Sequence, residues 1–117
     1  MTEAKNQKKF AMIEILTLNL KPGMRERFHQ LLVSESIPIQ RKWKINVVAN
    51  GPSLHDENSY YVIRSFKSLE DRQNSQDNFY GSDDWQKGPR TGMLSLIENY
   101  SAIVISQEML KEWMGKL

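Results

Sequence analysis

The sequence predicts one α+β domain whose strands and helices follow the order β-α-β-β-α-β, with a further helix at the C-terminus. Three observations support this order. Four short segments are rich in apolar and β-branched residues and have the pattern of strands. Two longer segments, one between the first two strands and one between the last two, carry helix signals. Glycine and proline mark most of the boundaries between these segments.

The first half of the chain predicts a strand, a helix and a strand. Residues 10–20 form the first strand, and both of its faces are largely apolar apart from Glu14. A strand of this kind is covered on both sides, by helices on one side and by a second layer on the other. Residues 24–36 carry apolar side chains at three- and four-residue spacing, which predicts a helix that ends at Pro38. Residues 44–50 predict the second strand.

The second half repeats this order of elements. Residues 60–66 are aromatic and β-branched and predict the third strand. Ser68 then caps a helix that runs to about residue 79, with Asp71 in the reciprocal capping position. The other predicted elements are a helix over 89–99 that begins at Pro89, a fourth strand over 100–106 and a terminal helix over 107–115.

This order is typical of the ferredoxin-like fold, in which right-handed crossovers give a four-stranded antiparallel sheet with helices on one face. At 117 residues we expect one domain over residues 10–117, preceded by a disordered tail over residues 1–9. The second face of the sheet needs a cover that one subunit of this length does not supply. We therefore expect a homodimer in which a second copy covers it.

Composition argues against several classes of function. Sixteen basic and fourteen acidic residues give a net charge of +2, which is too balanced to indicate a nucleic-acid partner. The chain has no cysteine, so disulfides, thiolate metal ligands and cysteine nucleophiles are excluded. The first residues lack the apolar core of a signal peptide, and no apolar run has the length of a membrane helix. We expect a cytoplasmic protein with no membrane partner.

Four short motifs give the sequence a family resemblance. In chain order they are Glu14 with Leu20-Lys21-Pro22-Gly23, then Gly51-Pro52, then Phe66-Lys67-Ser68-Leu69-Glu70-Asp71-Arg72, and finally Asp84-Trp85. In their order and spacing, residues 13–105 resemble the NIPSNAP family of the dimeric alpha-beta barrel superfamily. The resemblance implies a homodimer in which the open faces of two sheets pack together, with a ligand pocket in each subunit.

Superfamily relatives include cofactor-free monooxygenases, small lactone isomerases and haem-handling enzymes, while many members have no assigned activity. This sequence departs from the family pattern at four positions. Leu16 and Leu18 stand where the family often has Arg and Tyr, and Val62 and Arg64 stand where it often has His and Trp. Activities that depend on those polar groups are not expected here. Residues 68–99 contain no histidine, which argues against haem, and we expect neither a metal nor an organic cofactor.

Two residues are candidates for catalysis. Arg64 is a permanent charge in an otherwise apolar strand, and a buried guanidinium needs a partner. It would either anchor a ligand oxygen or form an ion pair, with Glu14 on another strand or across the dimer. His29 flanks the apolar stripe of the first helix. It would either act as a general base at a pocket rim or lie at the core boundary, hydrogen-bonded to backbone or water.

Three residues are candidates for the wall of a ligand pocket. Tyr60 shares a strand face with Arg64. Trp85 and Arg90 lie around the breaks at Gly81 and Gly88, where they would form a lid with an apolar wall and a charged rim. The alternative is that Trp85 plugs the end of the core.

The sequence leaves two functions open. The first is a homodimeric protein that binds a small apolar organic ligand and, if it is an enzyme, acts as a cofactor-independent monooxygenase or isomerase. In that case Arg64 or Arg90 would stabilise an oxyanion, and His29 or a tyrosine would move a proton. The second is a non-catalytic homodimeric module for binding or interaction, with its pocket filled by side chains.

Overall fold

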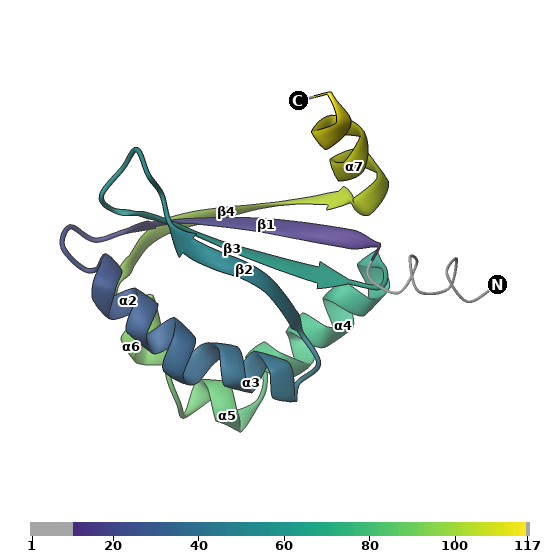
Figure 1. Cartoon of the computed structure of the whole chain (residues 1–117). Coiled ribbons are helices and arrows are strands. Elements are labelled where there is room, and N and C mark those ends of the chain that lie inside the picture. The colour runs from purple at the N-terminus through teal and green to yellow at the C-terminus, as the bar shows by residue number, and fades with distance from the viewer. Residues whose placement is uncertain (1–10, 117) are drawn as a thin grey trace.

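The computed structural model describes residues 11–116, so the tail expected over residues 1–9 lies outside the described residues. Four antiparallel strands form one sheet in the order β2-β3-β1-β4 (Figure 1). The strands are β1 (Met12–Leu20), β2 (Asn46–Pro52), β3 (Ser59–Phe66) and β4 (Ile97–Ser106). The predicted α+β class, with its ferredoxin-like order of elements, is confirmed.

Helices lie on both sides of this sheet, but unequally. The helical elements are α2 (Arg25–Leu31), η1 (Leu32–Ser36), α3 (Ile37–Lys42), α4 (Leu69–Tyr80), α5 (Asp83–Gln86), α6 (Arg90–Leu94) and α7 (Gln107–Gly115). Figure 1 shows α2 to α6 below the sheet in the view chosen, while α7 stands above β4 on the opposite side. We call the side that carries α2 to α6 the helix side and the opposite side the outer face. Within residues 11–116, no helix has the length and apolar character to cross a bilayer.

The first helical segment continues past Pro38, so the prediction that it ends there is wrong. A turn of π-helix, η1, interrupts the α-helical ladder, and the N–H of Ile37 donates to the carbonyl of Leu32 five residues back. Pro38 then lies in the first turn of α3, directly after the π-helical turn. Lys44 ends the segment with a φ of 65°, and β2 therefore begins at Asn46, two residues later than expected.

The second half of the chain follows the prediction at α4 and departs from it after Pro89. Ser68 Oγ accepts a hydrogen bond from the Asp71 N–H at 3.0 Å, which confirms the predicted cap of α4. The helix expected over residues 89–99 is a single short element, α6. It stops early because Ile97 already pairs with Leu20 of β1, so β4 starts three residues before the expected position.

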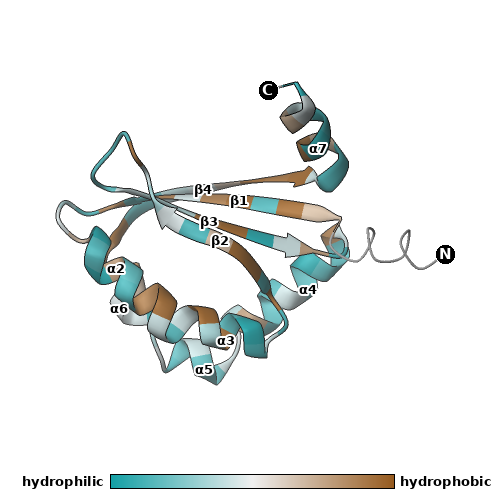
Figure 2. Cartoon of the chain, viewed as in Figure 1, coloured by the Kyte–Doolittle hydropathy of each residue, from teal (hydrophilic) through white to brown (hydrophobic). Residues whose placement is uncertain are grey.

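The hydrophobic core lies between the sheet and helices α2 to α6. Figure 2 shows apolar residues along the strands and on the faces of the helices that turn toward them. The buried large side chains of this core come from the sheet, from four helices and from the connection between α3 and β2. They include Leu20, Phe28, Ile45, Tyr60, Phe66, Phe79, Trp85 and Met93.

The outer face carries a row of apolar side chains across all four strands. The strand registers place Ile15 opposite Ile103 on one side and opposite Ile63 on the other, and Ile63 opposite Ala49. Ile103 is 58% exposed. Helix α7, which stands on the same side of the sheet in Figure 1, carries the exposed apolar residues Met109, Trp113 and Met114. This row is the open sheet face that the two-sided apolar pattern of β1 predicts.

Candidate ligand cavity

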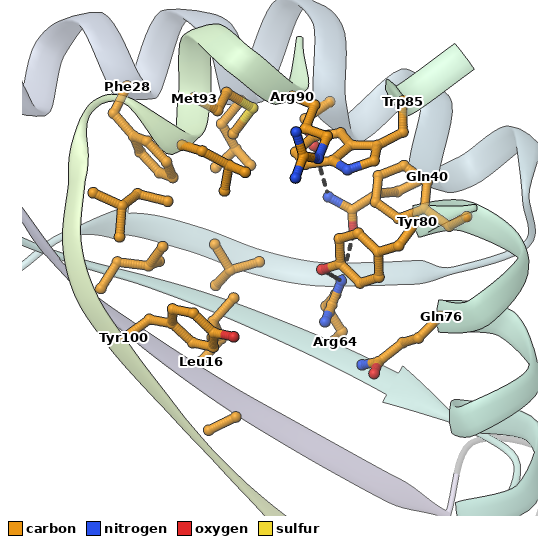
Figure 3. A pocket seen from close by; sticks show the side chains of 18 of the residues that line it. Leu16, Phe28, Gln40, Arg64, Gln76, Tyr80, Trp85, Arg90, Met93 and Tyr100 are labelled. Carbon is orange, nitrogen blue, oxygen red and sulfur yellow. Dashed lines mark hydrogen bonds between the residues drawn. The ribbon is translucent and has the colours of Figure 1, made fainter. Parts of the chain in front are cut away.

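A cavity of about 850 Å³ lies between the sheet and helices α2 to α6. Its volume falls within the range of roughly 300–1,000 Å³ that is typical of small-molecule sites. Strands β1, β3 and β4 supply its floor, and residues of α2 to α6 supply its walls (Figure 3). The cavity opens along β4, where Tyr100 is 68% exposed and Ala102 is also exposed.

One end of the cavity is apolar. Leu16 and Leu18 project from β1 toward the helices, because alternate residues of a strand point to the same face. Phe28 of α2 and Met93 of α6 close the wall opposite them. Figure 3 shows Phe28, Met93, Leu16 and Tyr100 gathered toward this end.

The other end is polar and is built around an ion pair between β1 and β3. The antiparallel register sets Glu14 directly opposite Arg64, and both side chains are almost fully buried. Glu14 Oε1 accepts from Arg64 Nη2 at 2.6 Å and from Arg64 Nε at 2.7 Å. This confirms the ion-pair reading of Arg64, with its partner on the neighbouring strand of the same subunit.

The second oxygen of Glu14 binds two residues of α4. Oε2 accepts from Arg72 Nε at 2.7 Å and from Gln76 Nε2 at 2.6 Å. Burial by itself would raise the pKa of Glu14, but the charge of Arg64 and the hydrogen bonds from both arginines outweigh it, so the pKa lies below its usual value. Glu14 is therefore a fixed carboxylate, and its lone pairs are committed to the protein.

Arg64 uses its remaining donors on the wall of the cavity. Nη1 donates to the side-chain oxygen of Gln40 at 3.1 Å and to the hydroxyl oxygen of Tyr80 at 3.2 Å. Gln40 in turn donates to Ser36 Oγ at 3.1 Å. Figure 3 shows this chain of contacts at the edge of the cavity. It holds the guanidinium in place and leaves little of it for a ligand.

Trp85 and Arg90 both line this cavity. Trp85 is buried in α5, with its ring 5.2 Å from that of Phe79 and 5.7 Å from that of Tyr80. It therefore serves as an apolar wall and also closes the end of the core. Arg90 begins α6 and is exposed, and Figure 3 shows its side chain beside Trp85 at the polar end. Among residues 11–116 it forms no hydrogen bond or ion pair.

His29 and Tyr60 lie outside this cavity. Tyr60 is buried beneath α2, and its hydroxyl is 2.6 Å from His29 Nδ1 and 2.9 Å from Asn50 Nδ2. The Asn50 amide nitrogen donates to the phenol oxygen, and His29 Nδ1 is the second hydrogen-bond partner of the same hydroxyl. Burial raises the pKa of the Tyr60 phenol, although the hydrogen bond from Asn50 opposes the effect. The pair borders a separate, shallow depression with Arg25 and Pro52.

Comparison with solved structures identifies the fold. The sequence matches no protein-family model and no curated protein. Three NIPSNAP structures are similar to this one: two family proteins from Agrobacterium tumefaciens strain C58, one described as of unknown function, and a NIPSNAP-like domain protein from Burkholderia xenovorans. Their TM-scores are 0.76, 0.76 and 0.75, at 23%, 17% and 19% identity. The alignments cover 84%, 83% and 83% of this chain and 88%, 85% and 84% of those chains.

The chain has the NIPSNAP fold. At these identities the likeness establishes the fold and no activity. Within this NIPSNAP-like fold, the four positions at which the sequence departs from the family pattern all line the cavity: Leu16, Leu18, Val62 and Arg64.

Three polar cavity residues that bind the Glu14–Arg64 pair were not predicted from the sequence. Gln40 lies beyond Pro38, where the helix was expected to have ended, and Arg72 and Gln76 lie on α4, whose polar residues look like a solvated helix face. One signal was present. Arg72 and Gln76 are four residues apart, so they share a helix face that can reach one buried carboxylate. The described residues hold no cluster of three metal-ligating side chains.

Proposed function

We propose that this protein binds a small, largely apolar organic molecule in the cavity between its sheet and helices. The observation that carries the proposal is the cavity itself, about 850 Å³ in volume, with apolar walls at one end and fixed polar groups at the other. Sites of this construction bind small molecules by apolar contact and orient them through a few polar groups. The ligand enters along β4, where the wall is most exposed.

Binding without catalysis fits the site better than proton-transfer chemistry does. The chain has two histidines, and neither lines the cavity: His29 pairs with Tyr60, and His55 bonds Ser53 in the loop between β2 and β3. The carboxylate of Glu14 is held by two arginines and a glutamine, so it is a poor general base. A monooxygenase or isomerase reaction in this cavity would depend on a tyrosine hydroxyl as its proton donor.

The second part of the proposal is that two copies assemble through the outer face. Ile103, Ile15 and Ile63 form an apolar row there, and exposed apolar rows of this kind mark interaction sites. A two-fold contact buries the same row on both subunits. The cavity lies on the opposite side of the sheet, so assembly and ligand binding can be tested separately.

The test uses N-phenylnaphthylamine, a neutral apolar probe that fluoresces when it leaves water. Ala102 lines the cavity and is exposed on β4, so Ala102→Trp fills the space without removing a core contact. Ala102→Ser is the matched control at the same position. We expect the wild type and Ala102→Ser to bind one probe per chain with similar affinity. The affinity of Ala102→Trp for the probe should be at least about tenfold lower.

Two results would count against the proposal. One is the absence of saturable binding to the wild type. The other is equal binding by wild type and Ala102→Trp, which would place the probe on the outer face or on α7. Circular dichroism and thermal unfolding of each variant establish that the compared proteins are folded.

A further inference from the structure

The polar end of the cavity contains a phenol whose proton has no acceptor among the described residues. Tyr80 Oη accepts from Arg64 Nη1 at 3.2 Å. A guanidinium carries donors only, so the Tyr80 proton cannot return to Arg64. No other hydrogen bond of this hydroxyl is formed within residues 11–116, and Tyr80 is 38% exposed. Its O–H is therefore available to an acceptor in the cavity.

The Tyr80 side chain is also held in position. Its ring makes edge-to-face contacts with Phe79 at 4.7 Å and Trp85 at 5.7 Å, and the Arg64 guanidinium lies 6.0 Å from the ring centre. A donor that is fixed before binding loses little conformational entropy when the ligand arrives. A hydroxyl that accepts from a cation is also a stronger donor, because the two hydrogen bonds polarise each other.

The charges around the cavity favour an anion at the same end. Three guanidinium groups and two carboxylates line it: Arg64, Arg72, Arg90, Glu14 and Glu98. Arg64 and Arg72 are paired with Glu14, whereas Arg90 has no partner among the described residues. Glu98 is six residues along β4 from Val104, the residue opposite Glu14, which places it roughly 20 Å from that end at about 3.3 Å per residue.

We propose that the cavity selects organic acids, and that Tyr80 and Arg90 together hold the anionic oxygen while the apolar body lies against Leu16, Phe28 and Met93. This inference rests on the proposed function and narrows it to a ligand class. Arg90 supplies the charge, and Tyr80 supplies an oriented hydrogen bond. The proposal assigns no role to Tyr60, whose hydroxyl contacts Asn50 and His29 outside the cavity.

Two fluorescent probes of nearly the same shape test the inference. Anilinonaphthalene sulfonate is a monoanion, and N-phenylnaphthylamine is its neutral counterpart without the sulfonate. We expect wild-type protein to bind the anion about tenfold or more tightly than the neutral probe. Arg90→Gln should lower the affinity for the anion about fivefold or more, and Tyr80→Phe should lower it about tenfold. Either substitution should change the affinity for the neutral probe less than about twofold.

Three further variants make the result specific. Arg90→Lys keeps the charge and should retain most of the preference for the anion. Tyr60→Phe removes a phenol hydroxyl outside the cavity and should bind both probes as the wild type does. Ala102→Trp should lose both probes, which excludes binding of the dyes to exposed apolar surface. Tyr80→Phe is expected to fold, since Arg64 Nη1 keeps Gln40 as an acceptor.

The two proposals fail in distinguishable ways. Equal affinity of the wild type for both probes, with binding lost in Ala102→Trp, overturns the selection of acids and leaves the ligand cavity intact. An anion preference that survives both Arg90→Gln and Tyr80→Phe overturns the assignment of these residues. Saturable binding of neither probe overturns the proposed function and this inference with it.

Discussion

Replacing Glu14 by glutamine should destabilise this protein more than any other single change of charge. The substitution keeps the shape of the side chain but leaves the buried Arg64 without a counter-ion. Its amide nitrogen must also face one of two sets of donors, either those of Arg64 or those of Arg72 and Gln76. Removing one partner of a buried ion pair lowers the free energy of unfolding by about 3–5 kcal/mol. For a chain of this length the midpoint of thermal unfolding should fall by about 12–20 °C.

The size of this effect should depend on pH in a defined direction. The pKa of Glu14 is lowered in the folded protein from an ordinary value of 4.5. Above pH 4.5 the carboxylate is charged in both states, so its contribution to stability is complete. Below pH 4.5 the unfolded chain binds a proton that the folded protein excludes, so stability falls as the pH approaches the folded pKa. Glutamine does not titrate, and the difference between the two proteins should therefore shrink in acid.

Urea unfolding of the wild type and Glu14→Gln at pH 7, 5 and 3.5 measures this difference directly. Glu57→Gln is the matched control, because Glu57 is exposed in the loop between β2 and β3. Replacing the ion pair by the double substitution Glu14→Leu with Arg64→Leu should cost less than Glu14→Gln alone, since no buried charge is left unpaired. A loss below about 1 kcal/mol at pH 7, or a loss that is the same at pH 3.5, would refute the reasoning.

Two further changes test other parts of the structure. Ile103→Lys places a charge in the apolar row of the outer face and should convert the proposed dimer into a folded monomer in light scattering, whereas Leu54→Lys, in an exposed loop, should leave the proposed dimer intact. A dimeric Ile103→Lys protein would contradict assembly through this face. Gly88→Ala should lower the unfolding free energy by more than about 1 kcal/mol in urea, because the new Cβ would overlap the Asp84 carbonyl oxygen; unchanged stability would show that the α5–α6 turn adapts.

The elements that sequence patterns predicted well are those whose causes are local. The cap at Ser68 depends on residues three apart, and α7 begins at Gln107 after Ser106, which caps the helix by accepting from the Met109 N–H. The ion pair between Glu14 and Arg64 was also predictable, since a lone charge in an apolar strand needs a partner. The register of the antiparallel strands β1 and β3 places the two residues directly opposite each other.

The elements that were predicted wrongly depend on tertiary contacts. Pro38 lies inside a continuing helical segment, directly after a π-helical turn that nothing in the sequence marks. β4 starts early because Ile97 pairs with Leu20 of β1, which is distant in sequence. Helix α6 therefore ends at Leu94, although the sequence predicts a helix as far as residue 99.

The candidate site was predictable in part for the same reason. Trp85 and Arg90 lie around glycine breaks, which fix where they can point, and both line the cavity with Arg64. His29 and Tyr60 were expected to share a pocket with Arg64. They meet each other outside that cavity, because His29 follows Phe28 on α2 and so lies about 100° around the helix from it. Their expected roles in catalysis and ligand binding stay predictions of the sequence pattern.

The central claim is that one small molecule occupies the cavity of each chain. Native mass spectrometry of the wild type and Ala102→Trp, each incubated with N-phenylnaphthylamine, measures occupancy and assembly in one spectrum. We predict a wild-type dimer that carries one probe per chain and an Ala102→Trp dimer that carries none. Equal occupancy of the two proteins, or none in the wild type, would contradict the claim that this cavity is a ligand site.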